Sequence, residues 1–165
     1  MAPRPPSDAV VALRSLGRRA RGVFAGLEDD ESPDDLAHRH GSAGTSALDE
    51  LASATRTIAF LGRAIEQSLV ESDPVLHPGV ADPAERAWPP ADGTVEQVVS
   101  ELGWEADRLA ERVEHVGADG WNRAARVAGH DATTTPLAVL WDAVDAAVAH
   151  LRAAEQTLGE VRGRP

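Results

Sequence analysis

Thr135-Pro136-Leu137-Ala138-Val139-Leu140-Trp141-Asp142-Ala143-Val144-Asp145-Ala146-Ala147-Val148-Ala149-His150-Leu151 is the stretch that decides the fold, and its pattern continues to about Leu158. Thr135 suits the N-cap of a helix, and Pro136 suits the first helical position, where a missing N–H costs nothing. The larger apolar residues recur at helical spacing, which predicts one face buried against other helices: Leu137, Trp141, Val144, Val148, Leu151 and Leu158.

Three further amphipathic helices are predicted upstream, and each follows a residue that can cap it. They run from Ser7 to about Leu27, from Ser46, or Thr45 before it, to about Val70, and from Thr94 to about Val116. Thr94 and Gln97 have the spacing of a capping box. Four helices without a strand pattern predict an all-α fold, a four-helix bundle.

A Pro-rich stretch, residues 71–92, separates the second predicted helix from the third. It holds five prolines, which rule out a regular helix: Pro74, Pro78, Pro83, Pro89 and Pro90. We expect a long crossover here, and loops of this length are often functional or mobile. The predicted organisation is a flexible leader at 1–6, a single bundle domain at 7–160 and a flexible tail at 161–165.

The composition excludes several classes of chemistry. The 165 residues contain no Cys and no Lys, which removes thiolate nucleophiles, cysteine zinc sites and Schiff bases. A net charge of −11 opposes nucleic-acid binding. No apolar stretch approaches the ~18 residues of a membrane span, and the N-terminus lacks the apolar core of a signal peptide. We therefore expect a cytoplasmic protein without nucleic-acid or membrane partners.

Several pieces of the chain, in this order, carry a family resemblance: residues 28–36, Ser46-Ala47-Leu48-Asp49-Glu50-Leu51-Ala52, Gly120-Trp121-Asn122-Arg123, and residues 144–152. Together they resemble the DinB-like superfamily, which includes the N-terminal domain of mycothiol-dependent maleylpyruvate isomerases. The resemblance implies a DinB-like four-helix bundle. In its metal-binding members it also implies a divalent cation held by three histidines, one on the second helix and an H-x-x-x-H pair on the fourth.

This sequence departs from the three-histidine pattern. The helix-two position falls at Ser53, or at Ala54 in the neighbouring register. The helix-four pair falls at Asp145 and Ala149, or at Ala146 and His150. Asp145 and His150 are five residues apart, about 140° around a helix, and so are poorly placed to share an ion. We expect no resident metal or other cofactor, and these positions are interpreted as vestiges of a metal site.

Three hypotheses follow for function. The first is a non-catalytic bundle with a degenerate metal site that binds a small molecule or a protein partner. The second is a divalent-metal-dependent enzyme of the mycothiol-type S-transferase or isomerase class. It would use Zn²⁺ or Ni²⁺ with substitute ligands such as Asp145 and His150 after a register shift. The third is a structural homodimer. Three tryptophans are candidates for lining a pocket or an interface: Trp88, Trp121 and Trp141.

Overall fold

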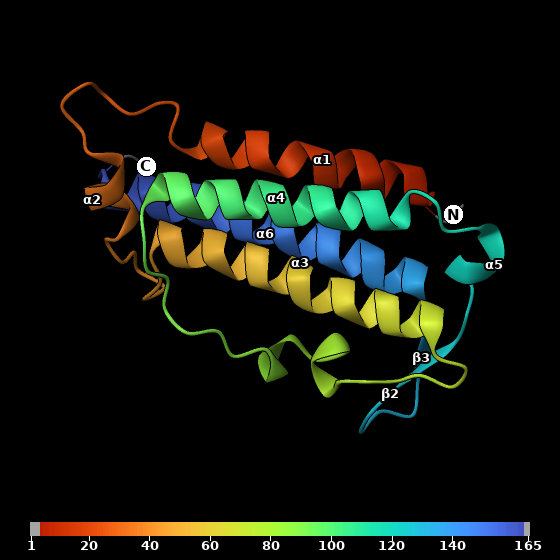
Figure 1. Cartoon of the computed structure of the whole chain (residues 1–165). Helices are drawn as coiled ribbons and strands as arrows, with labels where there is room; N and C mark the ends of the chain where they lie inside the picture. The colour runs from red at the N-terminus through yellow and green to blue at the C-terminus, as the bar shows by residue number, and fades with distance from the viewer. Residues whose placement is uncertain (1–3, 164–165) are drawn as a thin grey trace.

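The computed structural model describes residues 4–163 and confirms the predicted four-helix bundle (Figure 1). The four long helices are α1 (Pro6–Val23), α3 (Ala47–Val70), α4 (Val95–Val113) and α6 (Pro136–Val161). Helix α3 packs on α6 and α4, and α1 packs on the same two helices from the opposite corner of the bundle. Helices α3 and α4 run in the same direction, so their connection must return along the length of the bundle.

Side-chain caps fix the start of three long helices, as the sequence predicts. Ser46 caps α3 in a capping box with Asp49, and Thr94 caps α4 in the same way with Gln97. Thr135 caps α6 by accepting from the N–H of Ala138. Each cap satisfies N–H groups that the first turn of a helix leaves without a partner.

The boundaries predicted for the first helix are wrong at both ends. Helix α1 begins at Pro6, and Pro5 at its N-cap provides no side-chain hydrogen bond. Ser7 therefore lies inside the helix, because Pro6 already has the backbone torsion that a first helical residue needs. The helix ends at Val23, so that Phe24 and Leu27 pack on the core from the loop that follows.

Short elements complete the chain. Helix α2 (Pro33–Ala37), capped by Ser32, lies between α1 and α3, and α5 (Ala118–Trp121) precedes the last helix. The crossover contains β1 (Val75–Leu76) and the 3₁₀ turns η1 (Pro78–Val80) and η2 (Pro83–Glu85). β1 pairs in parallel with β2 (Ala125–Val127), which pairs antiparallel with β3 (Thr133–Thr134). This sheet was not predicted, because strands of two or three residues are too short to show an alternating pattern.

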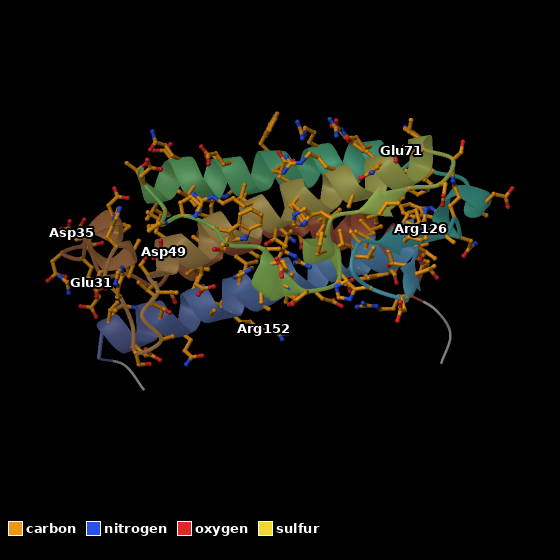
Figure 2. The ribbon with its side chains drawn as sticks, turned by 90° about the horizontal axis from the view of Figure 1, so that it is seen from below. Glu31, Asp35, Asp49, Glu71, Arg126 and Arg152 are labelled. Carbon is orange, nitrogen blue, oxygen red and sulfur yellow. The ribbon has the colours of Figure 1, made fainter. Side chains whose placement is uncertain are left out.

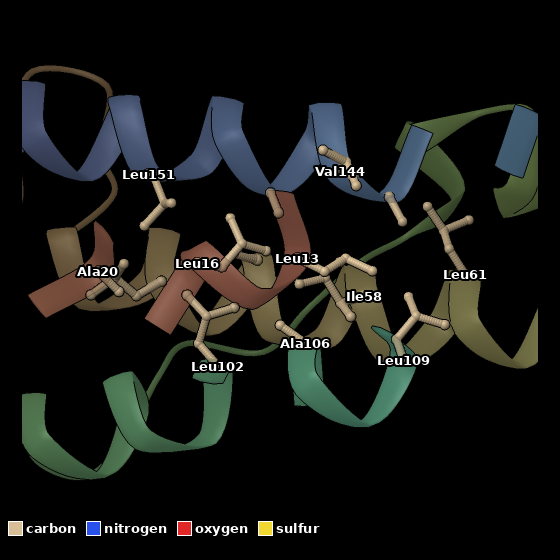
Figure 3. Close-up of a cluster of buried hydrophobic side chains, with 14 of the residues drawn as sticks. Leu13, Leu16, Ala20, Ile58, Leu61, Leu102, Ala106, Leu109, Val144 and Leu151 are labelled. Carbon is tan, nitrogen blue, oxygen red and sulfur yellow. The ribbon is translucent and has the colours of Figure 1, made fainter. Parts of the chain in front are cut away.

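The core runs along the centre of the bundle and is made of Leu, Ile, Val and Ala side chains from all four long helices (Figure 3). On α6, Val144, Leu151 and Leu158 are buried, as predicted. Leu137, Trp141 and Val148 lie only half-buried at the edge of the core, which corrects the predicted face. The buried stripe also contains Val139, Leu140 and three alanines: Ala143, Ala147 and Ala154. The sequence pattern favours large residues and so gave too much weight to Trp141.

The ends of the described chain are held against the bundle. Arg4 contacts Asp145 of α6, and Arg162, just after α6, pairs with Glu31 at 2.6 Å. The predicted leader at 1–6 and tail at 161–165 therefore do not coincide with the helix ends. Residues 1–3 and 164–165 of these two segments lie outside the described residues. Within residues 4–163, none of the helices is both long enough and apolar enough to cross a membrane.

Candidate functional site

The interface between α3 and α6 is the place to look for a metal site, because the predicted ligand positions all lie on these two helices. It is the most extensive helix interface of the bundle. Both helices carry small buried side chains, such as Ala54 on α3 and Ala147 on α6, and the two backbones pack closely along their length. A ligand from each helix can therefore reach a common point.

One polar contact joins the two helices at this interface. His150 Nδ1 lies 2.7 Å from Glu50 Oε2, and the two side chains are 30% and 15% exposed. Glu50 stands in the first turn of α3, directly after the Asp49 of the capping box. Ser53 follows Glu50 by three residues and Ala146 precedes His150 by four, so each lies on the same helix face as its neighbour. The Ala146 and His150 register is thus the one that faces α3.

Asp145 and Ala149 belong to a different side of α6 and are exposed. The Asp145 carboxylate accepts two hydrogen bonds from the Arg4 guanidinium, at 3.0 and 2.7 Å. The same guanidinium stacks 3.8 Å from the centre of the Trp141 ring, and Trp141 Nε1 donates to the Arg4 carbonyl oxygen at 3.1 Å. Asp145 and His150, the substitute ligands of the enzyme hypothesis, are therefore not brought together.

The crossover lies along α3 and α6 (Figure 2). Asp49 anchors one end of it, because Asp49 Oδ1 accepts from the Ala91 N–H at 2.8 Å. Burial alone would raise the pKa of Asp49, but the hydrogen bonds from Ala91 and Ser46 outweigh it and hold the pKa below its ordinary value. Arg56 adds a second anchor by donating to the Pro89 carbonyl oxygen at 2.5 Å. The end of the crossover nearest to Glu50 is thus fixed by charged side chains of α3.

Aromatic packing holds the middle of the crossover. Phe60 on α3 meets the rings of His77 and Trp88 edge-on, with centroids 5.5 and 6.1 Å apart. Trp88, a predicted pocket or interface residue, is therefore half-buried against α3. Arg86 donates to the Gly79 carbonyl oxygen and lies near Asp142 of α6. Partial desolvation raises the pKa of Asp142, and Asp145 adds to the rise while Arg86 opposes it.

The residues present at this interface do not fit the three-histidine ion that the resemblance implies. Ser53, Ala54, Ala146 and Ala149 supply no imidazole, and only Glu50 and His150 meet. Metal sites need several ligands that converge from a rigid frame. Within residues 4–163, no group of three His, Asp or Glu side chains is placed to hold a metal ion.

The Gly120-Trp121-Asn122-Arg123 motif has a structural role at the opposite end of α3. Arg123 donates to the carbonyl oxygens of Leu69 and Glu71 at 2.6 and 2.5 Å, where the last turn of α3 leaves carbonyls unsatisfied. Trp121 is buried and forms the wall of two neighbouring clefts. Sequence reasoning missed the roles of Glu50, Arg4 and Arg123, whose partners lie far away in the chain. For Glu50 the only signal was the acidic first turn of the helix, and for Arg123 it was the place of this residue in the motif.

The helix order and the long crossover between parallel α3 and α4 define a four-helix bundle, the fold that the resemblance predicts. No family model matches the sequence, and no curated protein sequence matches it significantly. The chain is similar in structure to YfiT from Bacillus subtilis, with a TM-score of 0.73 over 100% of this chain and 95% of that one, at 13% identity. YfiT is described as a probable metal-dependent hydrolase with an unusual four-helix bundle topology. At this identity the likeness establishes the fold alone.

Proposed function

We propose that this protein is a non-catalytic DinB-like bundle that has exchanged the metal site for a protein hydrogen bond, and that it binds a small molecule or a protein partner. One observation carries the proposal. Where the resemblance places a cation between α3 and α6, the Glu50 carboxylate and the His150 imidazole bind each other at 2.7 Å.

The surrounding residues support this proposal. An imidazole that donates Nδ1–H to a carboxylate keeps one ring nitrogen for a metal, and two ligands make a weak site. Asp145, one of the two α6 carboxylates that lie five residues from His150, is engaged by Arg4. The crossover is pinned next to Glu50 through Asp49 and Ala91, so a third ligand from the crossover would require those contacts to break.

The test is the metal content of protein purified without a histidine tag, before and after incubation with Zn²⁺, Ni²⁺ and Mn²⁺. We expect far less than one ion per chain and a melting temperature that does not respond to the ions. A His150→Ala variant serves as the control for the one interfacial histidine. Stoichiometric metal that is lost in this variant would overturn the proposal.

The rival is a divalent-metal-dependent enzyme, of a thiol-transferase or hydrolase kind. The description of YfiT and the direct contact between Glu50 and His150 are the observations in its favour. In that case, metal-loaded protein would activate water or a thiol, and both Glu50→Gln and His150→Ala would abolish the activity. Activity that survives both substitutions would exclude a metal centre at this interface.

A structural homodimer is the second alternative. Two large apolar side chains, Val11 on α1 and Trp104 on α4, are 69% and 62% exposed and would be covered in such a dimer. Light scattering measures the mass directly. A dimer that Trp104→Glu converts to a monomer would support this function, and a monomeric wild-type protein would exclude it.

A further inference from the structure

The start of α1, the end of α4 and α5 meet at one end of the bundle (Figure 1). Residues of these segments line a groove there. It consists of two adjoining clefts of about 340 and 510 Å³. Pro6, Val116 and Trp121 line both of them. Each volume falls within the range of small-molecule sites, roughly 300–1,000 Å³. The groove is separate from the interface of Glu50 and His150.

The walls of the groove are mainly apolar. Trp121 is 5% exposed and lines both clefts, while Val11, which lines one of them, is 69% exposed. Leu137 and Ala118 extend the apolar wall toward the start of α6. An elongated apolar molecule would cover these side chains and displace water from them, which favours binding by roughly 25 cal/mol for each Å² buried.

Two arginines stand at the margins of the groove, and they differ in how firmly they are held. Arg4 is fixed by two hydrogen bonds to Asp145 and by the Trp141 ring. Arg14 makes a single hydrogen bond to Glu114, at 2.8 Å, and the two side chains are 49% and 43% exposed. Exposed pairs of this kind contribute little stability. The Arg14 guanidinium therefore retains donors for a further anion. Glu114 lines the same cleft, so a bound carboxylate must replace it as the partner of Arg14 while the Glu114 side chain turns to water.

We infer that this groove binds a small amphipathic anion, with an elongated apolar body along Trp121 and a carboxylate on Arg14. A guanidinium pairs with a carboxylate through two parallel hydrogen bonds, which an alcohol cannot reproduce. The chain's charge of −11 repels anions at long range, but this repulsion is screened beyond about 8 Å at physiological salt. The inference rests on the proposed binding function and not on the metal content.

The probes are octanoate, octanol and octylamine, which share one apolar body and differ in the charge of the head group. Binding is followed by the indole N–H signals in ¹H–¹⁵N spectra, each assigned through a Trp→Phe variant. We expect octanoate to shift the Trp121 signal saturably while Trp88 and Trp104 stay unchanged, and to bind about tenfold more tightly than octanol. Octylamine binding most tightly, equal affinity of octanoate and octanol, or simultaneous shifts of Trp104 would each overturn the inference.

Two variants locate the binding. Arg14→Gln should remove the advantage of octanoate over octanol, and Ala118→Trp should weaken both by filling the groove from an exposed position. Ala84→Trp, on an exposed turn of the crossover, is the matched control and should change neither affinity. Failure of octanoate to bind the metal-free protein would refute this inference alone, whereas stoichiometric metal in a protein that binds octanoate would refute only the proposed function.

Discussion

Ala146→His should create a divalent-metal site between α3 and α6. Ala146 precedes His150 by four residues, one helical turn, and His150 Nδ1 already lies 2.7 Å from Glu50 Oε2. One added imidazole would complete a set of two histidines and one carboxylate, which binds Zn²⁺ and leaves a further coordination position open. Ala146 is half-buried, so a larger side chain can point toward the existing pair without filling the core.

The expected stabilisation follows from linkage between metal binding and folding. At a free Zn²⁺ concentration of 100 times Kd, the free energy of unfolding rises by about 2.7 kcal/mol. For a domain of this size, 1 kcal/mol corresponds to roughly 2–4 °C, so the melting temperature should rise by about 5–11 °C. The metal must displace the hydrogen bond between Glu50 and His150, and that cost is contained in the apparent Kd.

The assay is thermal unfolding by circular dichroism with and without Zn²⁺, together with elemental analysis of the tag-free variant. Ala149→His is the matched control, because Ala149 is exposed on the side of α6 that carries Asp145. Adding His150→Ala to Ala146→His should abolish the response. Equal stabilisation of Ala149→His, or no response from a folded Ala146→His protein, would refute the assignment of the α6 face that meets α3.

Three further predictions concern stability measured by urea unfolding. Gly17→Ala would place a methyl group 2.9 Å from the backbone of α4 and should destabilise by about 1–3 kcal/mol, whereas Gly22→Ala in open space should stabilise by up to about 1 kcal/mol. Asp49→Ala should cost about 1–3 kcal/mol at neutral pH. Because the pKa of Asp49 is lowered by folding, the wild type should lose this advantage as the pH falls through that pKa, and the variant should show a weaker acid dependence. Trp141→Ala should cost less than Trp121→Ala, for which about 3–5 kcal/mol is expected of a buried aromatic, and equal losses would contradict the edge position of Trp141.

Local signals in the sequence were sufficient for most of the fold. The starts of α3, α4 and α6 depend on a cap and the residue three positions later, so Ser46, Thr94 and Thr135 identify them directly. The start predicted for α1 was wrong because Pro6 already has the backbone torsion of a first helical residue. The helix therefore begins at Pro6 and not after a Ser7 cap. Helical spacing identified Val144, Leu151 and Leu158 as buried. It could not show that alanines make up much of the buried face of α6.

The candidate site depended on contacts that no local pattern encodes. Glu50 and His150 are 100 residues apart in sequence, and nothing in either segment identifies the partner. The resemblance located the two helices and left two registers open. In the packing of α3 on α6, His150 of one register contacts Glu50. Arg4 and Asp145 are separated by 141 residues. Arg4 binds the Asp145 carboxylate, which the enzyme hypothesis required as a metal ligand.

The crossover explains why the Glu50 carboxylate and the His150 imidazole depend on each other at this interface. Because α3 and α4 are parallel, the connecting chain must return along the bundle, and it does so along α3 and α6. Polar groups near such a chain lose hydration and need partners. A carboxylate and an imidazole that satisfy each other remove that cost without an ion, whereas either alone would be left partly desolvated. Glu50→Ala should therefore destabilise the protein more than the double variant Glu50→Ala/His150→Leu, and the reverse order would show that neither side chain depends on the other.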